Sequence, residues 1–389
     1  MTVTMRSFAK INIGLRIGAV RQDGFHELLT VYQTIALHDV TRVSLSRGSG
    51  IEILCADPRV PKDESNTCFR MVEKAMRALH AKGRVVIEIE KRLPVQGGIG
   101  GASSNAVACL LGLEKALRKN LTAAEKLRIA AEVGSDLPLF LVGGTVLGVG
   151  RGEQVYPLED LPAVPCVLVT PQVGVSTPKA FAAWDRLCGG GMCGAFALAR
   201  EDSSLAVSSQ NQAGLRPAGQ PVAAVPTQAE PAELRSARPD QRSGPTPAEP
   251  IQSSASKLTA HEASDRMNEL GRGLSAWLSE SYSGAPSDFL ARRGRAENYL
   301  LALVRTGIEN DFERVVFPEY PELSDGKRAL LRAGAKYASL SGSGSTLYGL
   351  FASREAALHA AARLRKQGFA AQATMTVPRR AYWRRVVAA

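Results

Sequence analysis

One stretch of the sequence, residues 91–117, places a glycine-rich loop between a strand pattern and a helix pattern. Upstream of it, Val85, Ile87 and Ile89 occupy alternate positions, which predicts a strand with these residues on one buried face. Downstream, apolar residues repeat at helical spacing, namely Ala106, Cys109, Leu110, Leu113, Ala116 and Leu117. A helix that begins after such a loop exposes free N–H groups and the positive end of its dipole. The junction therefore predicts a binding site for phosphate.

The loop contains four glycines followed by two serines: Gly97, Gly98, Gly100, Gly101, Ser103 and Ser104. Glycine adopts positive φ at little cost and lets a ligand approach the backbone closely. A Walker loop needs a lysine after its last glycine, and none follows here. A Rossmann fingerprint that started at Gly98 would have Ser103 in place of its third glycine. The structural alternative is a flexible turn, although these six residues are more than a turn needs.

Length and composition are compatible with two globular domains, because the chain has 389 residues and 45% of them are hydrophobic. No apolar run approaches the length of a membrane span, and the first residues lack the pattern of a signal peptide. Six cysteines are spread without a disulfide framework, which favours reduced thiols. Cys188 and Cys193 are close in sequence, but no second Cys or His pair stands near enough to complete a zinc site. We therefore expect a cytoplasmic protein with no membrane partner and no metal held by the protein alone.

The formal net charge of +11 is compatible with a nucleic-acid partner, a polyanionic small substrate or solubility alone. The basic residues are dispersed, apart from arginines at positions 379, 380, 384 and 385. No module with interleaved basic and aromatic residues, as in RNA-recognition domains, is present. We therefore expect small-molecule substrates and no nucleic acid, and the oligomeric state stays open.

Polar side chains that could form a site occur early in the chain. Polar and apolar residues alternate over 3–18 as in a strand, with Lys10 and Asn12 on one face. An Asp-Gly dipeptide then signals a hairpin turn, and Phe25 and His26 follow it directly. The N-terminal part is therefore predicted to be rich in strands joined by tight turns.

Asp136 lies where a predicted helix over 121–132 ends and an apolar run begins. An aspartate in such a place is usually an N-cap or turn residue. However, Pro138 and the nearby glycine pairs restrict the local backbone, which suits a positioned side chain. A second loop of small residues, S-G-S-G-S at 341–345, lies between apolar runs, and helices are predicted over 327–333 and 354–367.

The composition changes after about residue 200. Eight of the 21 prolines of the chain lie between Pro217 and Pro250, and no hydrophobic periodicity survives there. Such a segment cannot bury enough apolar surface to offset the entropy lost on ordering. We therefore expect residues 200–262 to be disordered.

Three motifs in order resemble the GHMP kinase superfamily: A-K-I-N, P-V-Q-G-G-I-G-G-A-S-S-N-A and S-L-S-G-S-G-S-T. The stretches D-G-F-H-E-L, K-R-L-P, G-S-D-L-P-L-F and N-D-F-E are similar to members that act on a cytidine-diphosphate alcohol. The resemblance covers nearly the whole chain except about 185–265. A single glycine loop would be weak support, whereas seven ordered motifs with compatible spacing are strong support.

This resemblance implies an α+β fold of two domains, one like ribosomal protein S5 and one an α/β sandwich. The implied boundaries are 1–160 for the ATP-binding, catalytic domain and 161–389 for the C-terminal domain, which the segment at about 200–262 interrupts. The implied reaction is ATP-dependent phosphorylation of the 2-hydroxyl of 4-diphosphocytidyl-2-C-methyl-D-erythritol, on the non-mevalonate route to isoprenoid precursors. Mg²⁺ is expected to be carried with ATP.

The same resemblance implies roles for individual residues. Lys10 and Asp136 match the catalytic pair, and residue chemistry agrees: a carboxylate can accept the proton of an attacking hydroxyl, while an ammonium keeps it ionised. The implied ATP-binding loop is Pro94, Val95, Gln96, Gly97, Gly98, Ile99, Gly100, Gly101, Ala102, Ser103 and Ser104. The implied pocket around the cytidine end is Asn12, Phe25, His26 and Phe181, where aromatic faces can stack on the base.

The sequence departs from the family pattern at three positions. Gln96 and Ala102 stand where glycine is usual, so Ala102 needs an ordinary φ or a cost of about 1 kcal/mol arises. Phe25 replaces a commoner tyrosine and keeps the ring. The alternatives are a GHMP kinase for mevalonate-type or homoserine-type alcohols and a GHMP-like binding protein without activity. Phe25 with Phe181 favours the cytidine substrate, and the intact Lys10 and Asp136 favour an enzyme.

Overall fold

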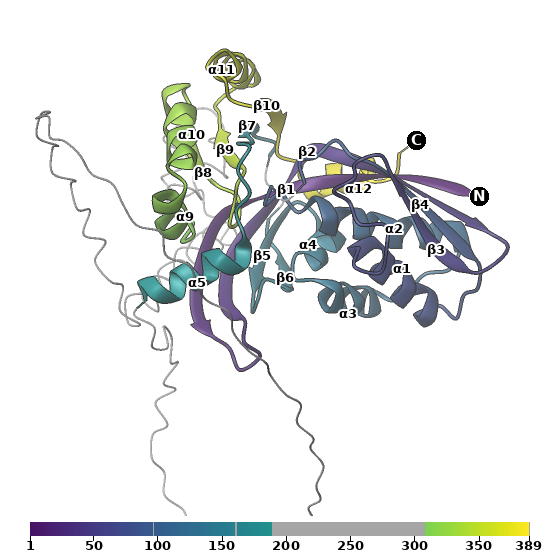
Figure 1. The fold of residues 1–389 in the computed structure, drawn as a ribbon. Coiled ribbons are helices and arrows are strands. Elements are labelled where there is room, and N and C mark those ends of the chain that lie inside the picture. Colours follow the sequence, from purple (N-terminus) through teal and green to yellow (C-terminus); the bar gives the residue numbers. More distant parts are fainter. Residues whose placement is uncertain (96, 160–161, 189–307, 389) are drawn as a thin grey trace, which may run out of the picture. The chain divides into compact units, whose positions relative to one another are not determined.

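The computed structural model describes residues 1–95, 97–159, 162–188 and 308–388 (Figure 1). Gln96, Cys193 and the segment predicted to be disordered at 200–262 lie outside these residues. Within the described residues, the strands form two sheets and helices pack against them, as expected for an α+β protein. No helix in this part of the chain is long and apolar enough to cross a membrane.

The first sheet is built on the hairpin of β1 (Thr2–Val20) and β2 (His26–Ser46). One edge of β2 pairs with β1 along its whole length, with register shifts at three places. The other edge is divided, since Thr30–Gln33 pair with β5 and Val40–Ser46 pair with β4. The remaining strands are β3 (Gly50–Cys55), β4 (Arg84–Glu90), β5 (Thr145–Val149) and β6 (Gln154–Pro157). The predicted N-terminal hairpin is therefore confirmed, and it supplies both long strands of this sheet.

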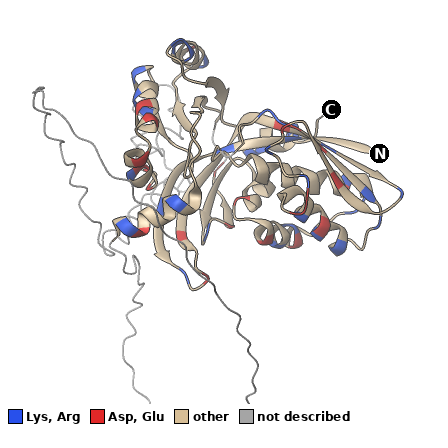
Figure 2. Cartoon of the chain, in the orientation of Figure 1, with Lys and Arg blue, Asp and Glu red and all other residues tan. Residues whose placement is uncertain are grey.

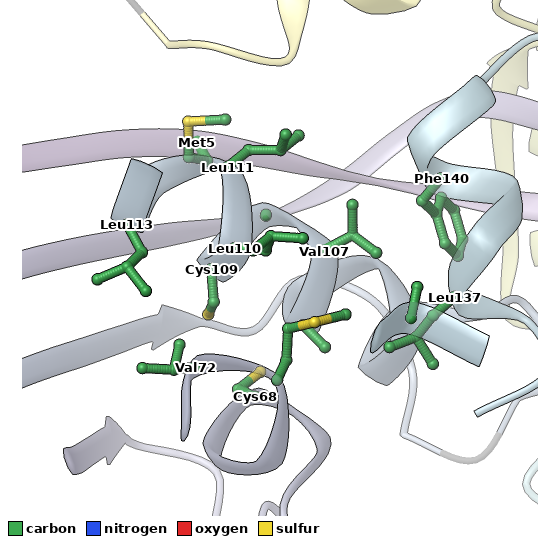
Figure 3. Close-up of a cluster of buried hydrophobic side chains, with 14 of the residues drawn as sticks. Met5, Cys68, Val72, Val107, Cys109, Leu110, Leu111, Leu113, Leu137 and Phe140 are labelled. Carbon is green, nitrogen blue, oxygen red and sulfur yellow. The ribbon is translucent and has the colours of Figure 1, made fainter. Parts of the chain in front are cut away.

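Helix α2 (Gly101–Leu117) is the central helix of this part of the fold. It packs against β1 and β2 on one side and against α1 (Thr67–Ala78) on the other. Figure 3 shows Cys109 of α2 pointing toward Cys68 and Val72 of α1. The sequence predicted one apolar face, whereas the helix is buried from Ser104 to Glu114, as is typical of a helix that is apolar on all sides.

Local signals explain where the neighbouring helices begin. The Asn66 side chain accepts a hydrogen bond from the Cys68 N–H and caps α1. Thr122 and Glu125 form a reciprocal capping box at the start of α3 (Ala123–Val133). The apolar run after Asp136 is α4 (Leu137–Val142), a short helix with proline in its first turn. The predicted helix over 121–132 is thus confirmed within two residues at each end.

The second sheet has the order β10-β7-β9-β8, with every neighbouring pair antiparallel. Its strands are β7 (Pro165–Val169), β8 (Tyr337–Leu340), β9 (Leu347–Leu350) and β10 (Ala371–Met375). The helices of this part are α5 (Thr177–Leu187), α9 (Glu313–Glu319), α10 (Pro321–Arg332) and α11 (Arg354–Lys366). Trp184, Phe312, Leu330 and Leu347 are buried together in its core.

Two helices differ from the sequence interpretation. Helix α10 begins at Pro321, six residues before the predicted start, because proline is tolerated in the first turn of a helix. The arginine-rich C-terminus forms α12 (Arg379–Arg385), which was not predicted as a helix. The Tyr382 hydroxyl of α12 donates to the carbonyl of Phe140 in α4 at 2.7 Å. Figure 2 shows Lys and Arg interspersed with Asp and Glu over the helices, in agreement with dispersed charge.

Candidate active site

The glycine-rich loop precedes α2 directly, as predicted, and two of its glycines have a left-handed backbone. Gly98 has a φ of 72°, and Gly100, the N-cap of α2, has a φ of 69° with no side-chain cap. A Cβ on Gly98 would overlap the carbonyl oxygen of Ser341 and lie 2.6 Å from that of Gly344. Glycine is therefore required at 98 for two reasons, the backbone angle and the contact with a second loop.

That second loop is the late S-G-S-G-S segment, which follows β8. The Ser341 hydroxyl donates to the carbonyl of Gly98 at 3.0 Å, and the Thr346 N–H donates to that of Gly97 at 3.2 Å. A Cβ on Gly342 would lie 3.6 Å from Lys10 Nζ. Two motifs more than 240 residues apart in sequence thus meet beside Lys10.

Lys10 and Asp136, the predicted catalytic pair, are brought together by the fold. Lys10 Nζ lies 3.2 Å from Asp136 Oδ2; the lysine side chain is 4% exposed and the aspartate side chain 35%. The Lys10 ammonium also donates to Asn12 Oδ1 at 2.6 Å. The amide of Asn12 in turn donates to the Thr30 hydroxyl at 2.9 Å. The buried ammonium of Lys10 therefore forms an ion pair with a carboxylate that is partly exposed and accessible to a ligand.

Three predicted pocket residues make aromatic or polar contacts close to the hairpin turn. The rings of His26 and Phe181 stack with centroids 4.7 Å apart and planes inclined by 12°. His26 Nε2 lies 2.8 Å from Asp185 Oδ1 of α5, and the rings of Phe181 and Phe312 form a T-shaped pair. Phe25 is half exposed beneath the Arg151 guanidinium. His26 therefore occupies one face of the Phe181 ring.

A cavity of ≈ 380 Å³ borders the glycine loop. One wall is the loop and the start of α2: Pro94, Val95, Gly97, Gly98, Ile99, Gly100, Gly101, Ala102, Ser103 and Asn105. Ser104, also predicted for ATP, is buried within α2 and is not part of this wall. The opposite wall comes from Arg59, Val60, Pro61, Ser65, Asn66, Thr67 and Cys68, with Ile89 and Lys91 beside it. Sequence reasoning missed this second wall, because nothing in its local pattern distinguishes it from a loop and a helix N-terminus.

A buried aspartate that the sequence interpretation also missed anchors the entry to the loop. Asp39 of β2 is fully buried and forms an ion pair with Lys91. Its Oδ1 accepts the N–H groups of Arg92 and Leu93 at 2.7 and 2.8 Å, and its Oδ2 accepts the Asn105 amide at 3.0 Å. Asn105 Oδ1 is buried without a hydrogen-bond partner among the described residues.

The structure explains why alanine is tolerated at position 102, where glycine is usual in the family pattern. Ala102 lies in the first turn of α2 and is not among the described residues with positive φ. Alanine therefore fits there without the strain that a left-handed position would cause.

Replacing Gly98 by alanine is expected to weaken ATP use at least about tenfold, because the new Cβ overlaps the carbonyl groups of the 341–345 loop and φ is unfavourable. The readout is KM for ATP together with the melting temperature. Gly368→Ala is the matched control, since Gly368 also has positive φ (88°) but nothing within 4 Å of a Cβ. If both variants used ATP like the unmodified protein, close packing of the two loops would not matter for nucleotide binding.

Comparison with known proteins shows the family of this chain. The family model described as GHMP kinases N terminal domain matches residues 66–144, and GHMP kinases C terminal matches residues 295–370. A 4-diphosphocytidyl-2-C-methyl-D-erythritol kinase of Solibacter usitatus is 30% identical over 92% of this chain and 83% of its own length. One from Synechococcus sp. (strain JA-2-3B'a(2-13)) is 31% identical over 94% of this chain and 90% of its own. The chain belongs to the GHMP kinase family, with the 4-diphosphocytidyl-2-C-methyl-D-erythritol kinases.

Solved structures of GHMP kinases share the fold. A crystal structure of 4-(cytidine 5'-diphospho)-2C-methyl-D-erythritol kinase aligns with a TM-score of 0.58 at 23% identity, over 96% of this chain and 98% of that one. Homoserine kinase from Cytophaga hutchinsonii aligns with a TM-score of 0.60 at 18% identity, over 97% of this chain and 95% of that one. The resemblance to GHMP kinases and the expected fold class are thus confirmed, and membership implies ATP use. Fold similarity does not choose the alcohol, because kinases for different alcohols align equally well.

Proposed function

We propose that this GHMP kinase transfers the γ-phosphoryl group of ATP to the 2-hydroxyl of 4-diphosphocytidyl-2-C-methyl-D-erythritol. The observation that carries the proposal is the Lys10–Asp136 pair, which adjoins the two small-residue loops. In addition, the chain is about 30% identical to 4-diphosphocytidyl-2-C-methyl-D-erythritol kinases over most of its length. In the reaction, the hydroxyl oxygen forms a bond to the γ-phosphorus and the bond to the β–γ bridging oxygen breaks. The hydroxyl proton passes to the Asp136 carboxylate, and ADP leaves with the electron pair of the broken bond.

The chain's own residues have distinct roles in this proposal. The N–H groups at the start of α2 bind phosphate oxygens, and the positive end of the helix favours their charge. Lys10 forms an ion pair with Asp136 and stabilises negative charge that develops on the transferring group. The cavity walls that include Val60, Asn66 and Lys91 would receive the nucleoside part of ATP.

In this proposal, Mg²⁺ binds together with ATP. Among the described residues no cluster of three or more His, Cys, Asp or Glu side chains could hold a metal ion by itself. Mg²⁺ prefers oxygen ligands and commonly binds mainly through nucleotide phosphates, which fits a site bordered by serine and backbone groups. Ser103 at the start of α2 would supply a protein oxygen, and the ion would neutralise phosphate charge when bound.

The hairpin end of the site would receive the cytidine. An ionised carboxylate only accepts hydrogen bonds, so in the His26–Asp185 pair the proton is on Nε2 of His26. In neutral imidazole the other nitrogen, Nδ1, is then an acceptor that can meet an amino group on a base edge. A base that stacks on Phe181 must share the space beside that ring with His26. The ring of Phe25, in contrast, is half exposed and available to stack on a base.

The direct test is ATP consumption by the purified protein with each alcohol supplied separately. We expect turnover with 4-diphosphocytidyl-2-C-methyl-D-erythritol and none with mevalonate or homoserine. Turnover with one of the latter only would overturn the substrate assignment and leave the kinase assignment intact. Absence of turnover with all three would favour a binding protein.

Replacing Phe25 by alanine is expected to raise KM for the cytidine substrate without changing the melting temperature, because this ring contributes little to the core. Loss of a base-stacking ring costs about 1–3 kcal/mol, or roughly 5- to 150-fold in affinity. Phe181→Ala should raise the same KM and also lower the melting temperature, since Phe181 packs on His26 and Phe312. Tyr156→Ala is the control, because Tyr156 is 52% exposed, as Phe25 is 50% exposed. An unchanged KM in both phenylalanine variants would mean that neither ring contacts the base.

A further inference from the structure

A buried tyrosine lies against the carboxylate of Asp136. Tyr32 is in β2 with Asn12 of β1 as its register partner on one side and Val146 of β5 on the other. The residue is 2% exposed, and its hydroxyl donates to Asp136 Oδ1 at 3.1 Å. The two carboxylate oxygens therefore have different partners, since Oδ2 faces the Lys10 ammonium at 3.2 Å.

Two glycines form the space in which the phenol ring lies. A Cβ on Gly148 would be 2.5 Å from Tyr32 Cε2, and a Cβ on Gly152 would be 2.5 Å from the Tyr32 hydroxyl. Gly152 also has a φ of 98°, which side chains rarely adopt. Any larger residue at either position would displace the phenol, so the backbone of β5 and of the turn after it holds the hydroxyl in place.

We propose that Tyr32 is a positioning residue for phosphoryl transfer, which fixes the orientation of the Asp136 carboxylate through a hydrogen bond to Oδ1. This role rests on the proposed function, in which Asp136 accepts the proton of the substrate hydroxyl. With Oδ1 held by the phenol and Oδ2 beside Lys10, the carboxylate cannot rotate freely. A fixed acceptor keeps its lone pairs directed toward the hydroxyl that attacks ATP.

The charged and titratable groups that face the phenol are Asp136, Lys10 and Glu153. Burial raises the pKa of Tyr32 well above its usual value, and the negative charges of Asp136 and Glu153 raise it further. The phenol therefore stays protonated and remains a donor over the working pH range. Lys10 Nζ lies 5.5 Å from the centroid of the same ring, so the ring also contacts the cation that pairs with Asp136.

Tyr32→Phe is the variant that tests the proposal, because it removes one hydroxyl and keeps the buried ring. A hydrogen bond to a charged group contributes about 1.5–3 kcal/mol, so we expect kcat to fall at least about tenfold. KM for ATP should stay unchanged. Tyr337→Phe is the control, since its hydroxyl donates to the backbone carbonyls of Ile13 and Ile308 and not to a carboxylate.

A second measurement does not depend on activity. In urea unfolding, Tyr32→Phe should lower the midpoint in the unmodified background and change it much less in an Asp136→Ala background. Equal shifts in both backgrounds, or a kcat equal to that of the unmodified protein, would overturn the proposal. A fall in kcat accompanied by an equal weakening of ATP binding would also overturn it, because a general loss of packing alone explains that result. Failure of the proposed function is recognised separately, as absence of turnover in the unmodified protein.

Discussion

Asp136→Asn is expected to leave the protein folded and to reduce kcat by about 10²–10⁴-fold, the usual cost of losing a general base. The amide has nearly the same shape and can still accept a hydrogen bond from Tyr32 at one oxygen. It cannot accept the proton of the attacking hydroxyl, and it leaves the Lys10 ammonium without its carboxylate. The measurement is single-turnover phosphoryl transfer with both substrates saturating, together with the melting temperature.

The control for this variant is Asp325→Asn. Asp325 is an exposed aspartate that pairs with Arg328 on the surface of α10, outside the proposed site. It should retain full activity, since an exposed ion pair contributes little. A folded Asp136→Asn protein with kcat within a few-fold of the unmodified enzyme would show that another group, or solvent, accepts the proton. The only role of Asp136 would then be to neutralise the charge of Lys10.

Asp39→Ala is expected to lower the free energy of unfolding by about 3–5 kcal/mol, the range for breaking a buried ion pair from one side. The change leaves Lys91, which is 9% exposed, without its partner. It also leaves the N–H groups of Arg92 and Leu93 without their acceptor. Urea unfolding measures the loss directly. Because these residues lead into the glycine loop, KM for ATP should rise as well.

Two comparisons make the Asp39 experiment specific. Asp39→Asn keeps one acceptor oxygen for the two backbone N–H groups and should lie between the alanine variant and the unmodified protein. Asp325→Ala removes an exposed aspartate and should change stability by no more than about 0.5 kcal/mol. A loss of stability in Asp39→Ala no larger than in Asp325→Ala would contradict the anchoring role of the buried carboxylate.

The features that were predictable from the sequence are those that depend on neighbours along the chain. The glycine loop before α2 could be recognised because a strand pattern, φ-permissive residues and a helix pattern follow one another within about thirty residues. The β1–β2 hairpin follows from the Asp-Gly turn and the alternation on both sides of it. The pairing of Lys10 with Asp136 was expected only through resemblance to GHMP kinases, because no local rule joins residues 126 positions apart.

Other features depend on contacts that only the folded chain creates. Asp39 meets Lys91 and Asn105 from 52 and 66 residues away, so its sequence context shows an ordinary strand residue. Helix α2 was expected to have one buried face, but α1 covers the opposite side, so the helix is buried nearly all round. The stack of His26 on Phe181 was likewise unpredictable, because α5 places the phenylalanine 155 positions after the histidine.

The sequence by itself therefore determined the local elements of the phosphate loop, the hairpin and the family to which the chain belongs. Only the tertiary structure decided which side chains share the site: the second cavity wall from 59–68, the Asp39 anchor and the Tyr32 hydroxyl on Asp136. The physical reason is the range of each interaction. Backbone conformation and periodicity depend on residues a few positions apart, whereas buried ion pairs and hydrogen bonds form between strands and helices that meet only when the core packs.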